Sequence, residues 1–136
     1  MRFLLASLAV LFLFHSVNCA ERDATSDKAV DAMLLSIETA VKNRDLSGFA
    51  ANFHSDFDAE AWFHRYYENL EDSVLATFVL RRFGAVEETR DGNRFKFIES
   101  RTTVTGEFLL RSFNAVTKSY DSRPFAIQSI TKFGEY

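Results

Sequence analysis

The chain has 136 residues, a formal net charge of −3 at pH 7 and 15% aromatic residues, with phenylalanine alone occurring 15 times. A single cysteine excludes an internal disulfide framework and a cysteine-rich metal site. The acidic balance gives no electrostatic attraction to nucleic acid or to an anionic membrane surface. The length fits one domain with a sizeable core, and the aromatic surplus can also line an apolar pocket.

Residues 1–19 have the composition of a signal peptide. Arg2 precedes a 12-residue apolar run over residues 3–14, whereas a membrane-spanning helix needs about 20 apolar residues. An uncleaved membrane anchor is the alternative that this length disfavours. Cleavage after Cys19, or after Ala20, leaves a mature chain without any cysteine. We therefore expect a secreted, extracellular protein with no membrane attachment after cleavage.

The mature chain is expected to begin with a short polar lead-in, residues 20–26, followed by one domain over residues 27–134. The first part of this domain is helical by pattern, because apolar residues recur every three or four positions. Asp45 and Asp58 stand where the side chains that cap helix N-termini are favoured. The predicted helices are a long one over residues 26–43, with Val30, Met33, Leu34, Ile37 and Val41 on one face, a short one after Asp45, and one over residues 59–70.

From residue 74 onward the pattern changes to the alternation typical of β-strands. The predicted strands cover residues 74–88, 95–105, 107–118 and 125–133. We expect an irregularity at Arg81-Arg82 in the first strand, and Asp91-Gly92 predicts a tight hairpin turn with positive φ angles. The fold class is therefore α+β, with N-terminal helices packed in the concave face of a curved antiparallel sheet.

The predicted strands carry apolar residues on both faces, unlike an antiparallel sheet with one solvated side. In the second strand Phe95 and Phe97 share a face with Glu99 and Arg101, while Ile98 lies on the other face. The last strand is predicted to place Phe125, Ile127 and Phe133 on one face and Ala126 and Ile130 on the other. One face must meet the helices. The other face allows a homodimer through the sheet, with ordinary exposed apolar residues as the alternative.

The order of the elements, together with Leu46-Ser47-Gly48-Phe49 and Phe53-His54-Ser55-Asp56-Phe57, resembles the nuclear-transport-factor-2-like superfamily. Its members share a long first helix, a short second helix ending in such a corner, a third helix and a curved sheet. The resemblance covers nearly all of residues 26–134 and is closest to small secreted single-domain members. It implies a cone-shaped domain with a pocket at the wide end. The superfamily includes isomerases, dehydratases, cyclases and transport adaptors, so the resemblance alone implies no activity.

The cystatin inhibitors are the main rival, because they are also small secreted chains with a helix on an antiparallel sheet. A cystatin requires a Gln-x-Val-x-Gly loop between its central strands. The nearest piece in this chain is Thr103-Val104-Thr105-Gly106, which lacks the glutamine, and three helices exceed the cystatin pattern. We therefore reject the cystatin assignment.

His54 and Asp56 are weak catalytic candidates, because a histidine oriented by a carboxylate can transfer protons near neutral pH. In the superfamily pattern, however, these corner residues commonly cap and turn the chain. His64 on the third predicted helix can face a pocket, although we expect it to face solvent. The histidines and acids form no recognisable metal-ligand spacing, and we predict no metal and no cofactor.

Glu99 is a third weak catalytic candidate, because a carboxylate inside an apolar cone can act as a general base. The interpretation that we favour pairs it with Arg101 or Arg111 on a solvated sheet face. The resemblance implies acids and tyrosines in this region for the enzymes of the superfamily. Their tyrosine and paired aspartates have no convincing counterparts at matching positions here, which weakens the enzyme hypothesis.

The third predicted helix carries an aromatic belt, Trp62, Phe63, Tyr66 and Tyr67, whose members are predicted core residues that can also form a pocket wall. The predicted pocket-lining residues are Phe53, Trp62, Phe63, Tyr66 and Phe97. The most economical function is a secreted, non-catalytic domain that binds a small apolar ligand or a protein partner. A small-molecule isomerase, dehydratase or cyclase is the alternative, and a structural homodimer is the third hypothesis.

Overall fold

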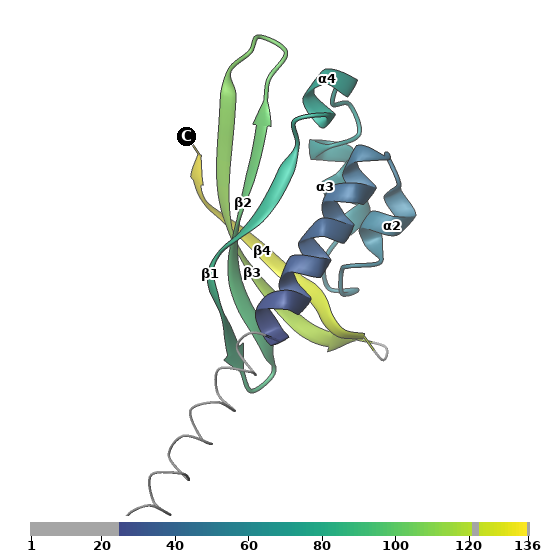
Figure 1. Cartoon of the computed structure of the whole chain (residues 1–136). Helices are drawn as coiled ribbons and strands as arrows, with labels where there is room; N and C mark the ends of the chain where they lie inside the picture. The colour runs from purple at the N-terminus through teal and green to yellow at the C-terminus, as the bar shows by residue number, and fades with distance from the viewer. Residues whose placement is uncertain (1–24, 121–122, 136) are drawn as a thin grey trace, which may run out of the picture.

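The computed structural model describes residues 25–120 and 123–135. The predicted signal peptide and most of the polar lead-in lie outside the described residues. The described part is an α+β domain, in which helices pack against one face of a curved, unclosed four-stranded antiparallel sheet (Figure 1). The predicted fold class is confirmed at this level.

All three predicted helices are present, and the N-terminal caps of the second and third follow from the sequence. The first covers residues 25–42, α2 covers Leu46–Ala50 and α3 covers Ala59–Tyr66. The Gly48 amide donates to the Asp45 carboxylate at 3.0 Å, and the Ala61 amide donates to Asp58 at 3.0 Å. The predicted apolar stripe of the first helix is buried throughout, at Val30, Met33, Leu34, Ile37 and Val41.

Helix α3 ends at Tyr66 rather than at the predicted Leu70. At Tyr67 the backbone leaves helical geometry, with φ −124° and ψ −30°. Arg44 fixes the segment that follows, because its guanidinium donates to the carbonyl oxygens of Glu68 and Leu70. Arg44 itself adopts the left-handed conformation, with φ 53°. The tertiary contacts therefore override the helical spacing of the sequence at this point.

A fourth helix, α4, covers Asp72–Leu75, where the sequence predicted the start of the first strand. This prediction was wrong because one helical turn buries both Val74 and Leu75, which an extended strand would place on opposite faces. Arg44 forms an ion pair with Asp72 at 2.9 Å, which ties α4 to the end of the first helix. The completely buried Phe78 then leads into the sheet.

The strands are β1 (Val79–Thr89), β2 (Gly92–Thr102), β3 (Phe108–Tyr120) and β4 (Arg123–Glu135). They pair in chain order, each antiparallel to the next, which confirms the predicted meander. The predicted last loop falls partly on residues outside the described ranges. The sheet curves toward the helices through β4, where Phe53 forms a parallel bridge with Ile127 (Figure 1). The His54 amide donates to the Ile127 carbonyl oxygen at 2.8 Å and fixes this contact.

The β1–β2 hairpin lies where Asp91-Gly92 predicted it, but its geometry differs from the prediction. Gly92 has an extended φ of 159° and pairs with Thr89, and Asp91 does not adopt a positive φ. The glycine is required for another reason. A Cβ atom at Gly92 would lie 1.9 Å from the backbone carbonyl oxygen of Thr117 on β3. Gly92 therefore allows a close approach of β3 rather than the turn conformation.

The irregularity of β1 lies between Phe83 and Glu87, just after the predicted position at Arg81-Arg82. Gly84 adopts φ 80° there, in the region that favours glycine. Such a bulge bends an edge strand and increases its twist. The sheet therefore curves around the helices at this point.

Carboxylates of the first helix cover the exposed edge of β1. The Leu80 amide donates to Glu38 at 3.0 Å, and the Val86 amide donates to Asp27 at 3.0 Å. Arg82 lies 3.4 Å from Asp27 as a further ion pair. These bonds occupy backbone groups that an uncovered edge strand would offer to another chain. The β1 edge is therefore protected against strand addition.

Bulges in β4 separate residues that the sequence predicted on one face. The β3–β4 register shifts near Thr117 and again near Phe113. Ile127 is consequently buried in the core, whereas Phe133 is 49% exposed and lies with its ring 5.6 Å from Lys96 Nζ. The predicted common face of Ile127 and Phe133 was therefore wrong, because period-two alternation fails across a bulge.

Candidate functional site

A small pocket opens between α3 and the sheet, and we call it the α3–sheet pocket. Its volume is about 110 Å³. Its lining residues are Trp62, Tyr66, Tyr67, Glu99, Arg111, Phe113 and Lys132. Lys132 is exposed while Glu99 is only 2% exposed, so the pocket leads from the surface to a buried carboxylate.

The helical side of the pocket is aromatic. Trp62 and Tyr66 lie one helical turn apart on α3, with ring centroids 4.6 Å apart. The Trp62 ring also meets Phe113 of β3 edge-on, at 6.3 Å. The Trp62 indole N–H donates to the Tyr67 hydroxyl at 3.5 Å, which aligns both side chains. Tyr67, the C-cap residue of α3, lies four residues after the buried Phe63 and is 6% exposed.

The sheet side of the pocket is polar. Glu99 of β2 stands opposite Arg111 of β3 in the strand register, and Arg111 Nη1 lies 3.8 Å from Glu99 Oε2. Their side chains are 2% and 19% exposed. The favoured interpretation of the sequence, a pair on a solvated sheet face, was therefore right about the partner and wrong about the environment. Such a pair is held in the interior at a desolvation cost.

Burial raises the pKa of the Tyr67 phenol well above its ordinary value, and the charge and hydrogen bonding of Glu99 raise it further. Tyr67 therefore stays a neutral hydroxyl beside the carboxylate. Arg101, which neighbours Glu99 on the same strand face, opposes the shift. Arg101 is itself 8% exposed, and its Nη1 atom has no hydrogen-bond partner among the described residues. The site thus concentrates charge in an apolar interior.

His54 and Asp56 lie elsewhere, in an open hollow of about 540 Å³ that we call the corner hollow. The Asp56 backbone amide donates to His54 Nδ1 at 3.0 Å, and Gln128 of β4 donates to Asp56 at 3.0 Å. The corner hollow shares no lining residue with the α3–sheet pocket. The fold therefore does not bring His54 and Asp56 together with Glu99.

The predicted pocket residues divide into three groups. Trp62 and Tyr66 line the α3–sheet pocket. Phe63 and Phe97 belong to the core, where Phe97 stacks on Phe113 at 5.0 Å, and Phe53 lines the corner hollow. Sequence reasoning included Tyr67 in the aromatic belt of the third helix, but it missed Arg111, Phe113 and Lys132 as lining residues. The pairing of β2 with β3, which follows from the hairpin, places Phe113 beside Phe97 and Arg111 beside Glu99.

His64 projects from the exposed side of α3, between Glu60 and Glu68. Its expected solvent exposure agrees with the 43% exposure of its side chain. The Glu68 carboxylate, at 2.7 Å, raises the pKa of His64 above its ordinary value, and Glu60 adds to this effect. This histidine therefore does not reach the α3–sheet pocket.

No family model matches the chain, and searches of curated proteins and of solved structures found no significant match. Within residues 25–120 and 123–135, no three His, Cys, Asp or Glu side chains are grouped to hold a metal ion. No helix in this part of the chain has the length and hydropathy to cross a membrane. The α3–sheet pocket is therefore interpreted from its own geometry.

Proposed function

We propose that this chain is a secreted binding domain of the nuclear-transport-factor-2-like type, and that its α3–sheet pocket holds a small, largely apolar molecule. The observation that carries the proposal is the combination of aromatic walls at Trp62, Tyr66 and Phe113 with a buried carboxylate at Glu99. Binding sites of this kind are mostly apolar, with a few polar groups that fix orientation. The leader-like residues 1–19 support secretion.

The size of the pocket limits the ligand. A cavity of about 150 Å³ accepts benzene in another protein, whereas pockets for drug-sized molecules measure about 300–1,000 Å³. At about 110 Å³, the α3–sheet pocket matches one small ring or a short branched chain that partly protrudes to solvent. Large lipids and steroids do not fit this volume.

The first test is mass spectrometry of the full chain expressed with its leader in a secretory host. The denatured mass identifies the cleavage site, after Cys19 or after Ala20. Under native conditions we expect an additional small mass that disappears on denaturation. A protein that remains inside the cells overturns the secretion proposal. An empty protein that binds no member of a library of single-ring compounds overturns the binding proposal.

A pair of variants locates the binding site. Trp62→Leu removes one wall of the α3–sheet pocket, and we expect the bound mass to disappear. As a control, Leu35→Ala removes an apolar side chain that is 60% exposed on the first helix, outside both the pocket and the outer face of the sheet, and we expect no change. Circular dichroism of both variants verifies folding. Equal loss in both variants would place the ligand elsewhere.

The second candidate function is a small-molecule isomerase, dehydratase or cyclase, and it is favoured by one specific observation. Glu99 is a carboxylate that is only 2% exposed, next to the neutral Tyr67 hydroxyl, which would donate to a substrate. Its ion pair with Arg111 argues for a structural role. Glu99→Gln distinguishes a catalytic role of Glu99 from a structural one, because it removes a general base while preserving side-chain volume. Turnover of a bound compound that is lost in Glu99→Gln would establish the enzyme.

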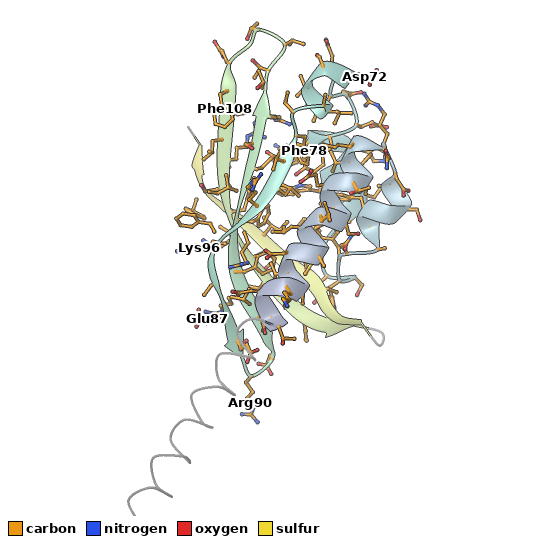
Figure 2. The ribbon with its side chains drawn as sticks, viewed as in Figure 1. Asp72, Phe78, Glu87, Arg90, Lys96 and Phe108 are labelled. Atoms are coloured by element: carbon orange, nitrogen blue, oxygen red, sulfur yellow. The ribbon has the colours of Figure 1, made fainter. Side chains whose placement is uncertain are left out.

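We also propose that two copies of the chain associate through the outer face of the sheet. Phe83, Phe108 and Phe133 are 57%, 64% and 49% exposed. Figure 2 places Phe108 and Lys96 on the side of the sheet that faces away from the helices. The first helix covers the β1 edge, and Ile127 on the β4 edge is hydrogen-bonded to Asn52 and His54, so face-to-face packing is favoured over edge pairing. Light scattering of wild type and Phe133→Ser tests this, and a monomeric wild type at high concentration overturns it.

A further inference from the structure

The α3–sheet pocket presents opposite charges at its two ends. Lys132 is exposed at the mouth, whereas Glu99 is buried at the inner end. Arg111, on the strand between those that carry Glu99 and Lys132, pairs with Glu99. An anionic ligand that enters fully would meet the Glu99 carboxylate. A cationic ligand would have to pass Lys132 and Arg111. The arrangement therefore disfavours a full charge of either sign inside the pocket.

The polar group of a ligand that reaches Glu99 must donate a hydrogen bond. An ion-paired carboxylate only accepts hydrogen bonds. The pocket already contains one such donor beside the carboxylate, the buried Tyr67 hydroxyl, which also accepts a hydrogen bond from the Trp62 indole N–H. A ligand hydroxyl or amide N–H would continue this chain of bonds. An apolar ring without a donor would desolvate the carboxylate without forming a hydrogen bond that compensates for the desolvation.

We infer, on the basis of the proposed function, that the α3–sheet pocket selects a neutral single-ring molecule with one hydrogen-bond donor directed at Glu99. The ring packs between Trp62, Tyr66 and Phe113, whose aromatic faces form the apolar wall. The chemical class is that of phenols and small cyclic amides. The pocket volume of about 110 Å³ admits one such ring and excludes fused-ring compounds.

The single tryptophan of the chain makes the test direct. Trp62 lines the pocket and is the only tryptophan in the sequence, so one indole N–H resonance reports the site. The uniformly ¹⁵N-labelled secreted protein is titrated with phenol, toluene, benzoate and benzylamine. Phenol and toluene have similar shapes and differ in the donor, while the other two carry opposite charges. We expect phenol to bind with a dissociation constant about tenfold lower than that of toluene, from the value of a charge-assisted hydrogen bond.

Matched variants assign the preference to Glu99. Glu99→Gln replaces the carboxylate by a neutral amide of the same shape, and we expect the phenol preference over toluene to fall to about threefold or less. Glu107→Gln makes the same change at an exposed position outside the pocket, and we expect the preference to be retained. Wild-type-like amide spectra of both variants verify folding.

The outcomes separate this inference from the proposed function. If toluene binds as tightly as phenol, the pocket binds ligands but Glu99 does not select a donor, and the inference fails alone. If benzoate or benzylammonium binds most tightly, the selection for a neutral ring is wrong. If none of the four compounds shifts the indole resonance and the wider library also fails, the proposed function fails as well.

Discussion

The α3–sheet pocket and the corner hollow hold the same kinds of groups under opposite conditions. Glu99 is 2% exposed in the pocket, whereas the Asp56 side chain is 55% exposed in the hollow. The hollow, at about 540 Å³, is the larger of the two, but it is open to solvent. An exposed carboxylate interacts weakly because water screens it, while a buried one interacts strongly with every neighbouring charge. Electrostatic interactions are therefore stronger in the smaller site, the α3–sheet pocket.

The two regions are physically connected by a chain of aromatic rings. Phe53 contacts Phe57 at 4.8 Å, Phe57 contacts Trp62 at 5.5 Å, and Trp62 contacts Tyr66 at 4.6 Å. The corner residues hold the start of this chain in place, because the His54 amide is bonded to β4. The corner thus has a structural role that its sequence pattern already implied, and the pocket depends on that role.

The largest difference between the two regions is expected from deleting each carboxylate. Glu99→Ala removes one partner of a buried ion pair and leaves Arg111 and Arg101 in the interior. We expect a loss of about 3 kcal/mol in the free energy of unfolding, measured by urea denaturation. Glu99→Gln should lose less, because the amide preserves volume and an acceptor. If Glu99→Ala were as stable as wild type, the pocket would be solvated and the contrast with the corner would disappear.

The sequence identified the first three helices, the meander and the sheet face that carries Glu99, because periodicity and the hairpin signal are local, but it missed α4. It did not identify the environment of Glu99. A strand has the same alternating sequence pattern whether its charged face is in water or is covered by an aromatic helix. The burial of Glu99 depends on packing against α3, which the strand sequence does not specify. The early end of α3 at Tyr66 similarly depends on Arg44, which is distant in sequence. The burial of Tyr67 was predicted, because it lies four residues after Phe63 on the same helical face, whereas the early end of α3 was not.

The next largest expected effect is the dependence of stability on pH that arises from Tyr67. Its folded-state pKa is raised, so its contribution to stability is present below its unfolded value of about 10 and is lost as the pH rises toward the folded value. We expect the melting temperature of wild type to fall more steeply than that of Tyr67→Phe above about pH 10. Absorbance at 295 nm should show one of the 4 tyrosines ionising only when the chain unfolds. Parallel stability profiles for wild type and Tyr67→Phe would show that the phenol is hydrated.

Substitutions in the corner hollow are expected to change the free energy of unfolding less than substitutions in the α3–sheet pocket. Asp56→Ala removes the hydrogen bond from Gln128 and the 3.4 Å contact with His54. The Asp56 side chain is 55% exposed. We expect a loss of about 0.5 kcal/mol in urea denaturation. Gln128→Ala removes the same bond from the other side and should give a similar loss. A loss above about 2 kcal/mol in Asp56→Ala would mean that the corner is as strongly coupled as the pocket.

The smallest effect is expected at His64, the exposed histidine on the side of α3 away from the pocket. Glu68 and Glu60 raise its folded-state pKa, so the protonated form stabilises α3 below the unfolded value of about 6.5. This stabilisation is lost as the pH rises through the folded value. NMR titration of the imidazole should give a higher pKa in wild type than in Glu68→Gln, with Glu60→Gln intermediate. If the three titrations coincide, the Glu68 contact at 2.7 Å is not maintained in solution, and α3 presents a fully solvated outer face opposite its buried inner one.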